Sequence, residues 1–308
     1  MASDIVSKFH KISAILPISI TKYGELDHKR FKILLFSLQK CQAQNWLERI
    51  YVITPGSQKK IIEKECRDID FIQINVLEED ELFSEFQKYN YWGYRKQMLI
   101  KLGAIKLIEN EFFLTLDSDL ICLQKIHLNQ LIIDSKALLT YQNKNVHIDW
   151  WESSAEILSV SLDVHSPGMS VTPAILSKTI CGYVIEEIES KFQQSWISVL
   201  MEIERFWTEY SLYFLCAQKR NCLTHYHLDS LDDRNTRLID DEYTVWFAED
   251  IERITKLNQL SLPSGLFAVL QSSTYIPLET ILNHLPNMLQ LSYDDEQLLK
   301  LRYAISAA

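Results

Sequence analysis

The sequence has few glycines and prolines, and it has no apolar run long enough to cross a bilayer. Seven glycines and seven prolines occur in 308 residues, and no internal repeat, low-complexity tract or Pro/Gly-rich linker divides the chain. A transmembrane helix needs about 20 consecutive apolar residues, so any membrane association is expected to be peripheral. The polar segment 1–11 lacks the apolar core of a signal peptide. We therefore expect a cytoplasmic protein with one domain over 1–290 and a C-terminal helix over 291–308.

The cysteines and charges exclude further classes of protein. The formal net charge is −10 and no basic cluster occurs, which argues against a nucleic-acid-binding surface. No glycine-rich phosphate loop follows the first predicted strand, because the residues there are Ile18-Ser19-Ile20-Thr21-Lys22. No Cys-x-x-Cys pair occurs, so we expect reduced, mostly buried thiols. The six cysteines are Cys41, Cys66, Cys122, Cys181, Cys216 and Cys222.

The sequence does contain enough apolar residues, 47% of the chain, for a large core. In the first half, predicted strands alternate with predicted helices, which favours a mostly parallel, Rossmann-like α/β sheet flanked by helices. These strands span 12–20, 49–54, 71–77 and 112–116, and the helices span 28–41, 58–66 and 94–108. In the second half we expect strands at 137–141, 222–228 and 266–270, an aromatic loop at 147–153, and helices at 173–192, 196–219 (interrupted near Arg205) and 294–304.

The most informative feature is an apolar strand, 112–116, that ends in Asp117, Ser118 and Asp119. A strand buried on both faces has no place for a carboxylate, so the Asp-Ser-Asp is predicted at its carboxyl end, where open α/β sheets bind ligands. Side chains at i and i+2 of an extended segment point the same way, and two carboxylates there suit a divalent cation that carries a phosphate. The alternative is a strand-end turn in which an aspartate caps the next segment.

The predicted helix before this strand carries the nearest cations. Gln97 and Lys101 are four residues apart and share a face, and Arg95 lies close by. Arg95 and Lys101 are candidates to bind the phosphates of a nucleotide that the cation also holds. The alternative for each residue is a solvated face of an amphipathic helix.

An ordered set of motifs resembles an uncharacterised bacterial family of GT-A fold glycosyltransferases with an Asp-x-Asp motif. The resemblance covers roughly residues 12–275, and the threonine at 208 stands where serine is commoner. Its motifs are Ile15-Leu16-Pro17 with 31–38, Gly93-Tyr94-x-x-Gln97-x-x-x-Lys101-Leu102, Phe113-Leu114-Thr115-Leu116-Asp117-Ser118-Asp119, Ser170-Val171-Thr172-Pro173-Ala174-Ile175-Leu176 and Phe206-Trp207-Thr208-Glu209-Tyr210-x-x-Tyr213.

The resemblance implies a GT-A-like fold and transfer of a sugar from a nucleotide-sugar donor, UDP- or GDP-type, to a glycan or glycolipid acceptor. It implies Mn²⁺ or Mg²⁺ on Asp117 and Asp119, a nucleotide-sugar-binding half over 12–120 and an acceptor-facing half over 121–290. A bound cation would neutralise the charge that develops on the departing diphosphate. The nucleotide contacts implied are Pro17, Ile18, Arg95, Gln97, Lys101, Asp117 and Ser118.

Glu209 is the candidate general base. A carboxylate among Phe206, Trp207, Tyr210 and Tyr213 is expected to be partly desolvated, which raises its pKa toward the working range. As a base it would take the proton of the acceptor hydroxyl and give inversion. The alternative is an acceptor-binding or helix-capping residue.

Histidine and tryptophan residues of the second half complete the candidate site. His225 and His227 share one side of a predicted strand, and many GT-A enzymes take a third metal ligand from a later histidine, for which His227 is our choice. Trp150 and Trp151 are candidate acceptor contacts, because aromatic faces suit the apolar face of a sugar ring. Structural histidines and ordinary core packing are the alternatives.

Two other functions fit parts of the sequence. An aspartyl-phosphate mechanism would use Asp117 as a nucleophile, but such enzymes usually carry the motif after the first strand. A non-catalytic carbohydrate- or nucleotide-binding protein is the other alternative, and the intact pair of aspartates and Glu209 argue against it.

Overall fold

The structure is a computed structural model that describes residues 11–20, 27–89, 93–169, 171–228, 237–256 and 262–306. Its main strands are β1 (Ile12–Pro17), β2 (Leu47–Thr54), β3 (Gln73–Glu78), β4 (Phe112–Thr115), β5 (Leu120–Cys122), β7 (Lys136–Ala137), β10 (Ala174–Ser177), β11 (Arg237–Ile239) and β12 (Gly265–Val269). Its helices are α1 (Asp27–Lys40), α2 (Lys59–Cys66), α3 (Glu79–Leu82), α4 (Gly93–Gly103), α5 (Leu128–Leu131), α6 (Ile148–Leu158), α7 (Lys178–Phe192), α8 (Trp196–Glu202), α9 (Glu209–Lys219), α10 (Leu223–Tyr226), α11 (Ile251–Lys256), α12 (Leu278–Leu289) and α13 (Glu296–Ser306).

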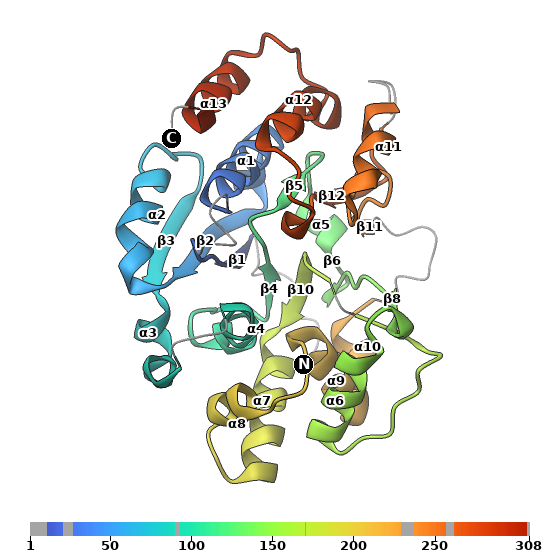
Figure 1. Cartoon of the computed structure of the whole chain (residues 1–308). Helices are drawn as coiled ribbons and strands as arrows, with labels where there is room; N and C mark the ends of the chain where they lie inside the picture. Colours follow the sequence, from blue (N-terminus) through green and yellow to red (C-terminus); the bar gives the residue numbers. More distant parts are fainter. Residues whose placement is uncertain are drawn as a thin grey trace.

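A five-stranded sheet with the order β10-β4-β1-β2-β3 lies at the centre of the fold (Figure 1). Strand β1 pairs in parallel with β2 and β4, and β2 pairs in parallel with β3, whereas β10 runs antiparallel to β4. Every residue of β1 and β4 is buried, which explains why their sequences are almost continuously apolar. The predicted mostly parallel α/β sheet is confirmed.

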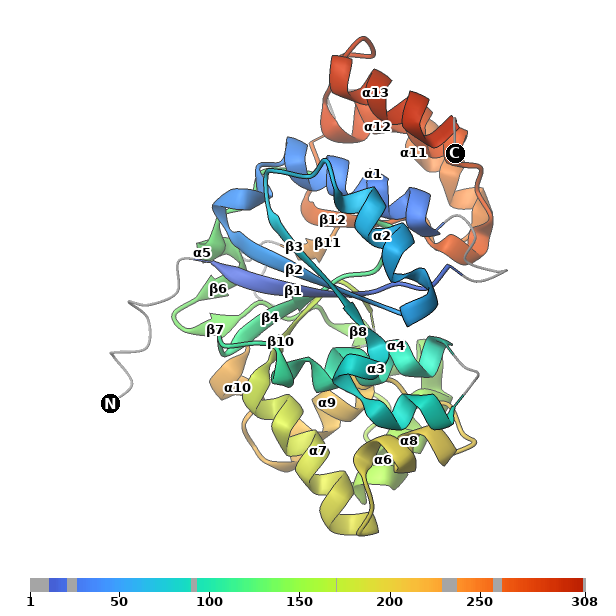
Figure 2. The ribbon, with the colours of Figure 1, turned by 90° about the vertical axis from the view of Figure 1, so that its left-hand side faces the viewer.

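The two faces of this sheet pack against different helices. Ala14 of β1 lies in a cluster with Phe31 of α1 and Ile62 of α2, whereas Ile15 lies in a cluster with Leu99 of α4 on the other face. Successive residues of a strand alternate between faces, so one apolar strand serves both layers. Figure 2 shows α1 and α2 on one side of the sheet and α4, α7, α8 and α9 on the other.

A smaller sheet with the order β11-β12-β5 extends the fold beside the first one. Strand β12 pairs in parallel with β11 and antiparallel with β5. Helices α12 and α13 cover this region, because Leu282 and Leu298 join Ile121 and Ala268 in one apolar cluster. Since β5 begins directly after Asp119, the Asp-Ser-Asp segment lies where the chain leaves one sheet for the other.

Four predicted elements of the second half were wrong in whole or in part. The break near Arg205 is confirmed between α8 and α9, and α7 confirms most of the helix expected at 173–192. The loop expected at 147–153 is part of α6, whose buried Trp151, Ala155 and Leu158 have helical spacing. The segment 174–177 forms strand β10 because it pairs with the open edge of β4. The strand expected at 222–228 is a single helical turn, α10, and that at 137–141 is limited to β7.

Candidate active site

A cleft of about 790 Å³ opens at the carboxyl ends of β1 and β4. Its walls come from segments far apart in the sequence: the start of α1, helix α4, the Asp-Ser-Asp segment, the residues before β10, the start of α9 and the loop after β12. Parallel strands deliver their polar ends to one edge of a sheet, which is where such folds bind ligands. Among the residues lining it are Asp117, Ser118 and Asp119.

The two aspartates occupy different environments. The side chain of Asp117 is 33% exposed, whereas Asp119 is hydrogen-bonded to the residues that follow β12 of the smaller sheet. The Oδ2 atom of Asp119 accepts a hydrogen bond of 2.9 Å from the backbone N–H of Ser272, and its carbonyl accepts one of 2.8 Å from Leu270. Burial and the nearby Asp117 raise the pKa of Asp119 from 3.8 to about 6. Both carboxylates line the same cleft.

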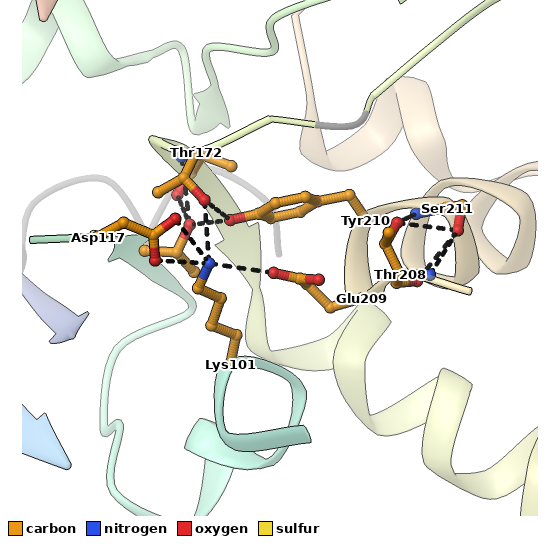
Figure 3. A network of polar contacts seen from close by, with 9 residues as sticks. Lys101, Asp117, Thr172, Thr208, Glu209, Tyr210 and Ser211 are labelled. Carbon is orange, nitrogen blue, oxygen red and sulfur yellow. Dashed lines mark hydrogen bonds and ion pairs between the residues drawn. The ribbon is translucent and has the colours of Figure 1, made fainter. Parts of the chain in front are cut away.

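Lys101 links the cleft wall of α4 to two carboxylates. Its Nζ atom lies 2.9 Å from Oδ1 of Asp117, 3.2 Å from Oε1 of Glu209 and 2.9 Å from the hydroxyl of Thr172 (Figure 3). Burial opposes the charge of the ammonium group, but the neighbouring Asp117, together with Tyr210 and Glu209, raises the pKa of Lys101 well above 10.5. Lys101 is therefore a buried cation at the centre of the site.

Glu209 is the first residue of α9, and its position is fixed by the helix cap before it. The hydroxyl of Thr208 accepts a hydrogen bond of 3.1 Å from the backbone N–H of Ser211, which is a standard N-cap. Glu209 is 3% exposed. Burial raises its pKa above 4.5, and Lys101 partly offsets this. The sequence expectation of a desolvated carboxylate at this position fits the structure.

The hydroxyl of Tyr210 ties α9 to the central sheet. It lies 2.8 Å from the hydroxyl of Thr115 in β4 and 2.7 Å from that of Thr172 before β10. Thr172 in turn accepts from Lys101. The N-terminus of α9, the end of β4 and the residues before β10 are thus joined in one buried polar network, which fixes Glu209 relative to Asp117.

The structure adds Asp27 and Arg30 of α1, which sequence reasoning missed. Asp27 lines the cleft, and burial and the nearby Asp119 raise its pKa from 3.8 to about 6. Arg30 is buried and donates a 2.9 Å hydrogen bond to the carbonyl of Leu270. Asp27 follows 21–26, which lies outside the described residues, and no motif distinguishes it from an ordinary first-turn aspartate.

Asp117 and Asp119 are the residues that fit a divalent cation. Their oxygens are the ligands that Mn²⁺ and Mg²⁺ prefer, and Asp27 lines the same cleft as both aspartates, so a cation there would offset the charge of neighbouring carboxylates. In the parts of the chain that the structure describes, no group of three or more His, Cys, Asp or Glu side chains is placed to hold a metal ion. Phosphate and water oxygens would have to complete the coordination.

Two predicted residues lie elsewhere. Arg95 points to the end of α8, where its guanidinium donates 2.9 Å to the carbonyl of Met201 and 3.1 Å to that of Glu204. The Nε2 atom of His227 lies 2.6 Å from the hydroxyl of Tyr213, and its Nδ1 atom lies 3.3 Å from the carbonyl of Ala137. Burial lowers the pKa of His227 to about 4. The structure does not bring Arg95 to the cleft, and both ring nitrogens of His227 already have partners.

The two tryptophans are neighbours in α6 but face different directions. Trp150 lines the cleft and stacks on His147 with ring centroids 3.7 Å apart. Trp151 is 1% exposed and packs edge-on against Phe214. Adjacent residues of a helix face directions about 100° apart, so only Trp150 is placed to contact a ligand in the cleft.

Pro17, Ile18 and Gln97 lie where the cleft meets a second cavity. This cavity, of about 540 Å³, extends along the ends of β1 and β2. All three predicted residues line both spaces. The two cavities together offer room for a ligand larger than a single sugar.

None of the helices in the described ranges combines the length and apolar character needed to span a membrane.

The fold is similar to that of a solved glycosyltransferase. Mouse xyloside xylosyltransferase 1 matches with a TM-score of 0.51 and 9% identity, over 87% of this chain and 100% of that one. The bifunctional glycosyltransferase WbbM matches with a TM-score of 0.48 and 6% identity, over 95% of this chain and 52% of that one. The glycosyltransferase GlyE of Streptococcus pneumoniae matches with a TM-score of 0.40 and 13% identity, over 85% and 54%. At 9% identity, the match to the xylosyltransferase concerns the fold alone.

These features define the molecule as an α/β protein with a GT-A-like fold, which confirms the predicted fold class. The chain belongs to the family of unknown function DUF6492, which matches residues 9–293. No match was found among curated protein sequences.

Proposed function

We propose that this protein is a metal-dependent glycosyltransferase that moves a sugar from a nucleotide-sugar donor to a carbohydrate acceptor. The observation that carries the proposal is the convergence of Asp117, Asp119 and Glu209 on one cleft, with Lys101 between Asp117 and Glu209. The GT-A-like fold supports it. The second cavity, which adjoins the cleft at Pro17 and Gln97, is the proposed place of the nucleoside.

Asp117 and Asp119 would hold Mn²⁺ or Mg²⁺, which when bound supplies positive charge to the donor diphosphate. Ser118 and Gln97 line the cleft where the donor would lie. Glu209 serves as the base, because it lines the cleft and its burial raises its pKa above 4.5. It accepts the proton of the acceptor hydroxyl as that oxygen attacks the anomeric carbon. The bond from that carbon to the donor diphosphate breaks, the nucleoside diphosphate leaves, and the configuration is inverted.

Trp150 and His147 form the acceptor side of the proposed site. Their stacked rings line the cleft, and an aromatic face suits the apolar C–H face of a sugar ring. The exposed Phe247 and the partly buried Trp246 line the same cleft and enlarge its aromatic part. We therefore propose a glycan or glycolipid acceptor.

Thermal unfolding with UDP and GDP, each with and without Mn²⁺, tests the proposal. A nucleoside diphosphate should raise the melting temperature only when Mn²⁺ is present. Asp119→Ala should abolish this shift, whereas Asp68→Asn, which removes an exposed carboxylate outside the cleft, should keep it. Stabilisation by free sugars alone would favour a non-catalytic carbohydrate-binding protein instead.

The variant Glu209→Gln distinguishes binding of the donor from catalysis of sugar transfer. The variant should retain the metal-dependent shift with the nucleoside diphosphate, because Glu209 is not proposed to bind the donor. Its release of nucleoside diphosphate from the preferred nucleotide sugar should fall by about 10²–10⁴-fold, the usual contribution of a general base. Equal turnover in Glu209→Gln and wild type would remove Glu209 from the mechanism.

A further inference from the structure

The hydrogen-bonding capacity of Lys101 is fully used in this structure. An ammonium group has three N–H donors, and Nζ of Lys101 has three partners: Asp117 at 2.9 Å, Thr172 at 2.9 Å and Glu209 at 3.2 Å. The side chain is only 5% exposed. Lys101 can contact the phosphate of a ligand only if it gives up one of these partners, so its position does not match that of a simple phosphate-binding lysine.

The three partners differ in how firmly they are held. Glu209 has a side chain that is 4% exposed and is fixed at the start of α9. Thr172 is also bonded to Tyr210. Asp117 is 33% exposed and faces the cleft, so it is the partner that a ligand can reach. A divalent cation on Asp117 would compete with Lys101 for the same carboxylate.

We propose that Lys101 is the resident counter-ion of Asp117, a positioning residue that neutralises this carboxylate in the cation-free protein. When a divalent cation arrives, Lys101 releases Asp117 and keeps its contact with Glu209. Occupancy of the cation site and the charge next to the base are thereby linked through one side chain. The inference rests on the proposed function, because it takes Asp117 as a cation ligand and Glu209 as the base.

The test measures binding of Mn²⁺ alone, by electron paramagnetic resonance of free Mn²⁺, to wild type and to Lys101→Met. Removing the competing positive charge should make the variant bind Mn²⁺ about tenfold more tightly, since like charges a few ångströms apart in a partly buried site repel strongly. A folded Lys101→Met protein that binds Mn²⁺ no more tightly than wild type would overturn the proposal. A lysine with a purely structural role would not tighten cation binding when it is removed.

The controls use the same helix. Lys96→Met also removes one positive charge from α4, but Lys96 pairs with Glu79 at 2.5 Å and not with the aspartates, so its Mn²⁺ affinity should stay within about twofold of wild type. Lys101→Arg keeps the charge and should restore near-wild-type affinity. If Lys101→Met fails to fold, Lys101→Gln, which is neutral but keeps a polar head, decides the question by the same criterion.

The outcomes for the two proposals differ. Absence of Mn²⁺-dependent nucleoside diphosphate binding by wild type would contradict the proposed function. Tighter Mn²⁺ binding by Lys101→Met, including a case in which only the variant binds Mn²⁺ measurably, would support the counter-ion. Failure of both proteins to bind Mn²⁺ would overturn it.

Discussion

Arg95 and Lys101 lie on one helix and have unrelated roles. Six residues of helix separate them by about 240° around the axis, so Lys101 faces the cleft and Arg95 faces the end of α8. Gln97 shares the face of Lys101 because the two are four residues apart, and both line the cleft. The helical spacing was available in the sequence, but which face meets the cleft was decided by the packing of α4.

Arg95→Met is expected to lower stability without affecting ligand binding. The guanidinium satisfies carbonyls at and beyond the end of α8, including those of Leu200 and Met201, and its loss leaves buried acceptors without partners. Chemical denaturation should show a loss of about 2–4 kcal/mol, whereas Arg49→Met, at an exposed pair with Glu48, should cost under about 1 kcal/mol. A folded Arg95→Met protein with weakened nucleotide binding would return Arg95 to the phosphate-binding role.

At the scale of elements, the start of α9 is what positions Glu209. The sequence indicated an interruption near Arg205, and the structure places it between α8 and α9. Thr208 then caps the new helix. The hydroxyl group makes this cap, and serine carries the same group.

Thr208→Ala should therefore lower the stability of the protein and also shift the position of Glu209, the proposed base. Loss of an N-cap costs about 1 kcal/mol, up to about 2, and Ser211 would lose its bonded partner. Thr208→Ser should behave as wild type. Denaturation midpoints of the two variants check this, and equal stability of Thr208→Ala and Thr208→Ser would show that the cap contributes nothing.

Two of the elements that sequence reasoning assigned wrongly have different physical causes. The short apolar segment at 174–177 suits a helix or a strand, and only the vacant edge of β4 made it a strand. The alternation around His225 and His227 suggested a strand, but backbone bonds such as that from the N–H of His227 to the carbonyl of Leu223 form one helical turn. In the first case pairing with a strand distant in sequence decided the structure, and in the second case a local helical turn outweighed the alternating sequence pattern.

At the scale of the whole molecule, two sheets generate the cleft. Strand β4 belongs to the central sheet and β5 to the smaller one, so the segment between them crosses from one to the other with Asp117 and Asp119 on it. The loop after β12 and the start of α1 then bring Ser272 and Asp27 to the same place. The resulting concentration of carboxylates makes the stability of the fold depend on pH.

Asp27→Asn should change the pH dependence of unfolding. Because the pKa of Asp27 rises from 3.8 to about 6 on folding, the native state binds more protons than the unfolded state between these values, and its stability falls as pH rises through them. Removing the carboxylate should abolish this loss of stability, which amounts to about 1–2 kcal/mol in the free energy of unfolding after allowance for solvent screening.

Free energies of unfolding from about pH 4 to pH 8 check this prediction. The curve of Asp27→Asn should be flatter than that of wild type, and that of Asp68→Asn, at an exposed position, should run parallel to wild type. An Asp27→Asn curve parallel to wild type would show that Asp27 keeps its ordinary acidity in the folded protein.

The sequence by itself determined the alternating strands and helices of the first half, the position of the Asp-Ser-Asp at a strand end and the burial of Glu209. These follow from local periodicity and from the cost of burying a carboxylate within a strand. Tertiary structure alone decided that Lys101 lies between Asp117 and Glu209, that Asp27 joins the aspartates, and that Arg95 and His227 are engaged elsewhere. Such neighbours depend on how helices pack and where loops return, which no spacing along the chain encodes.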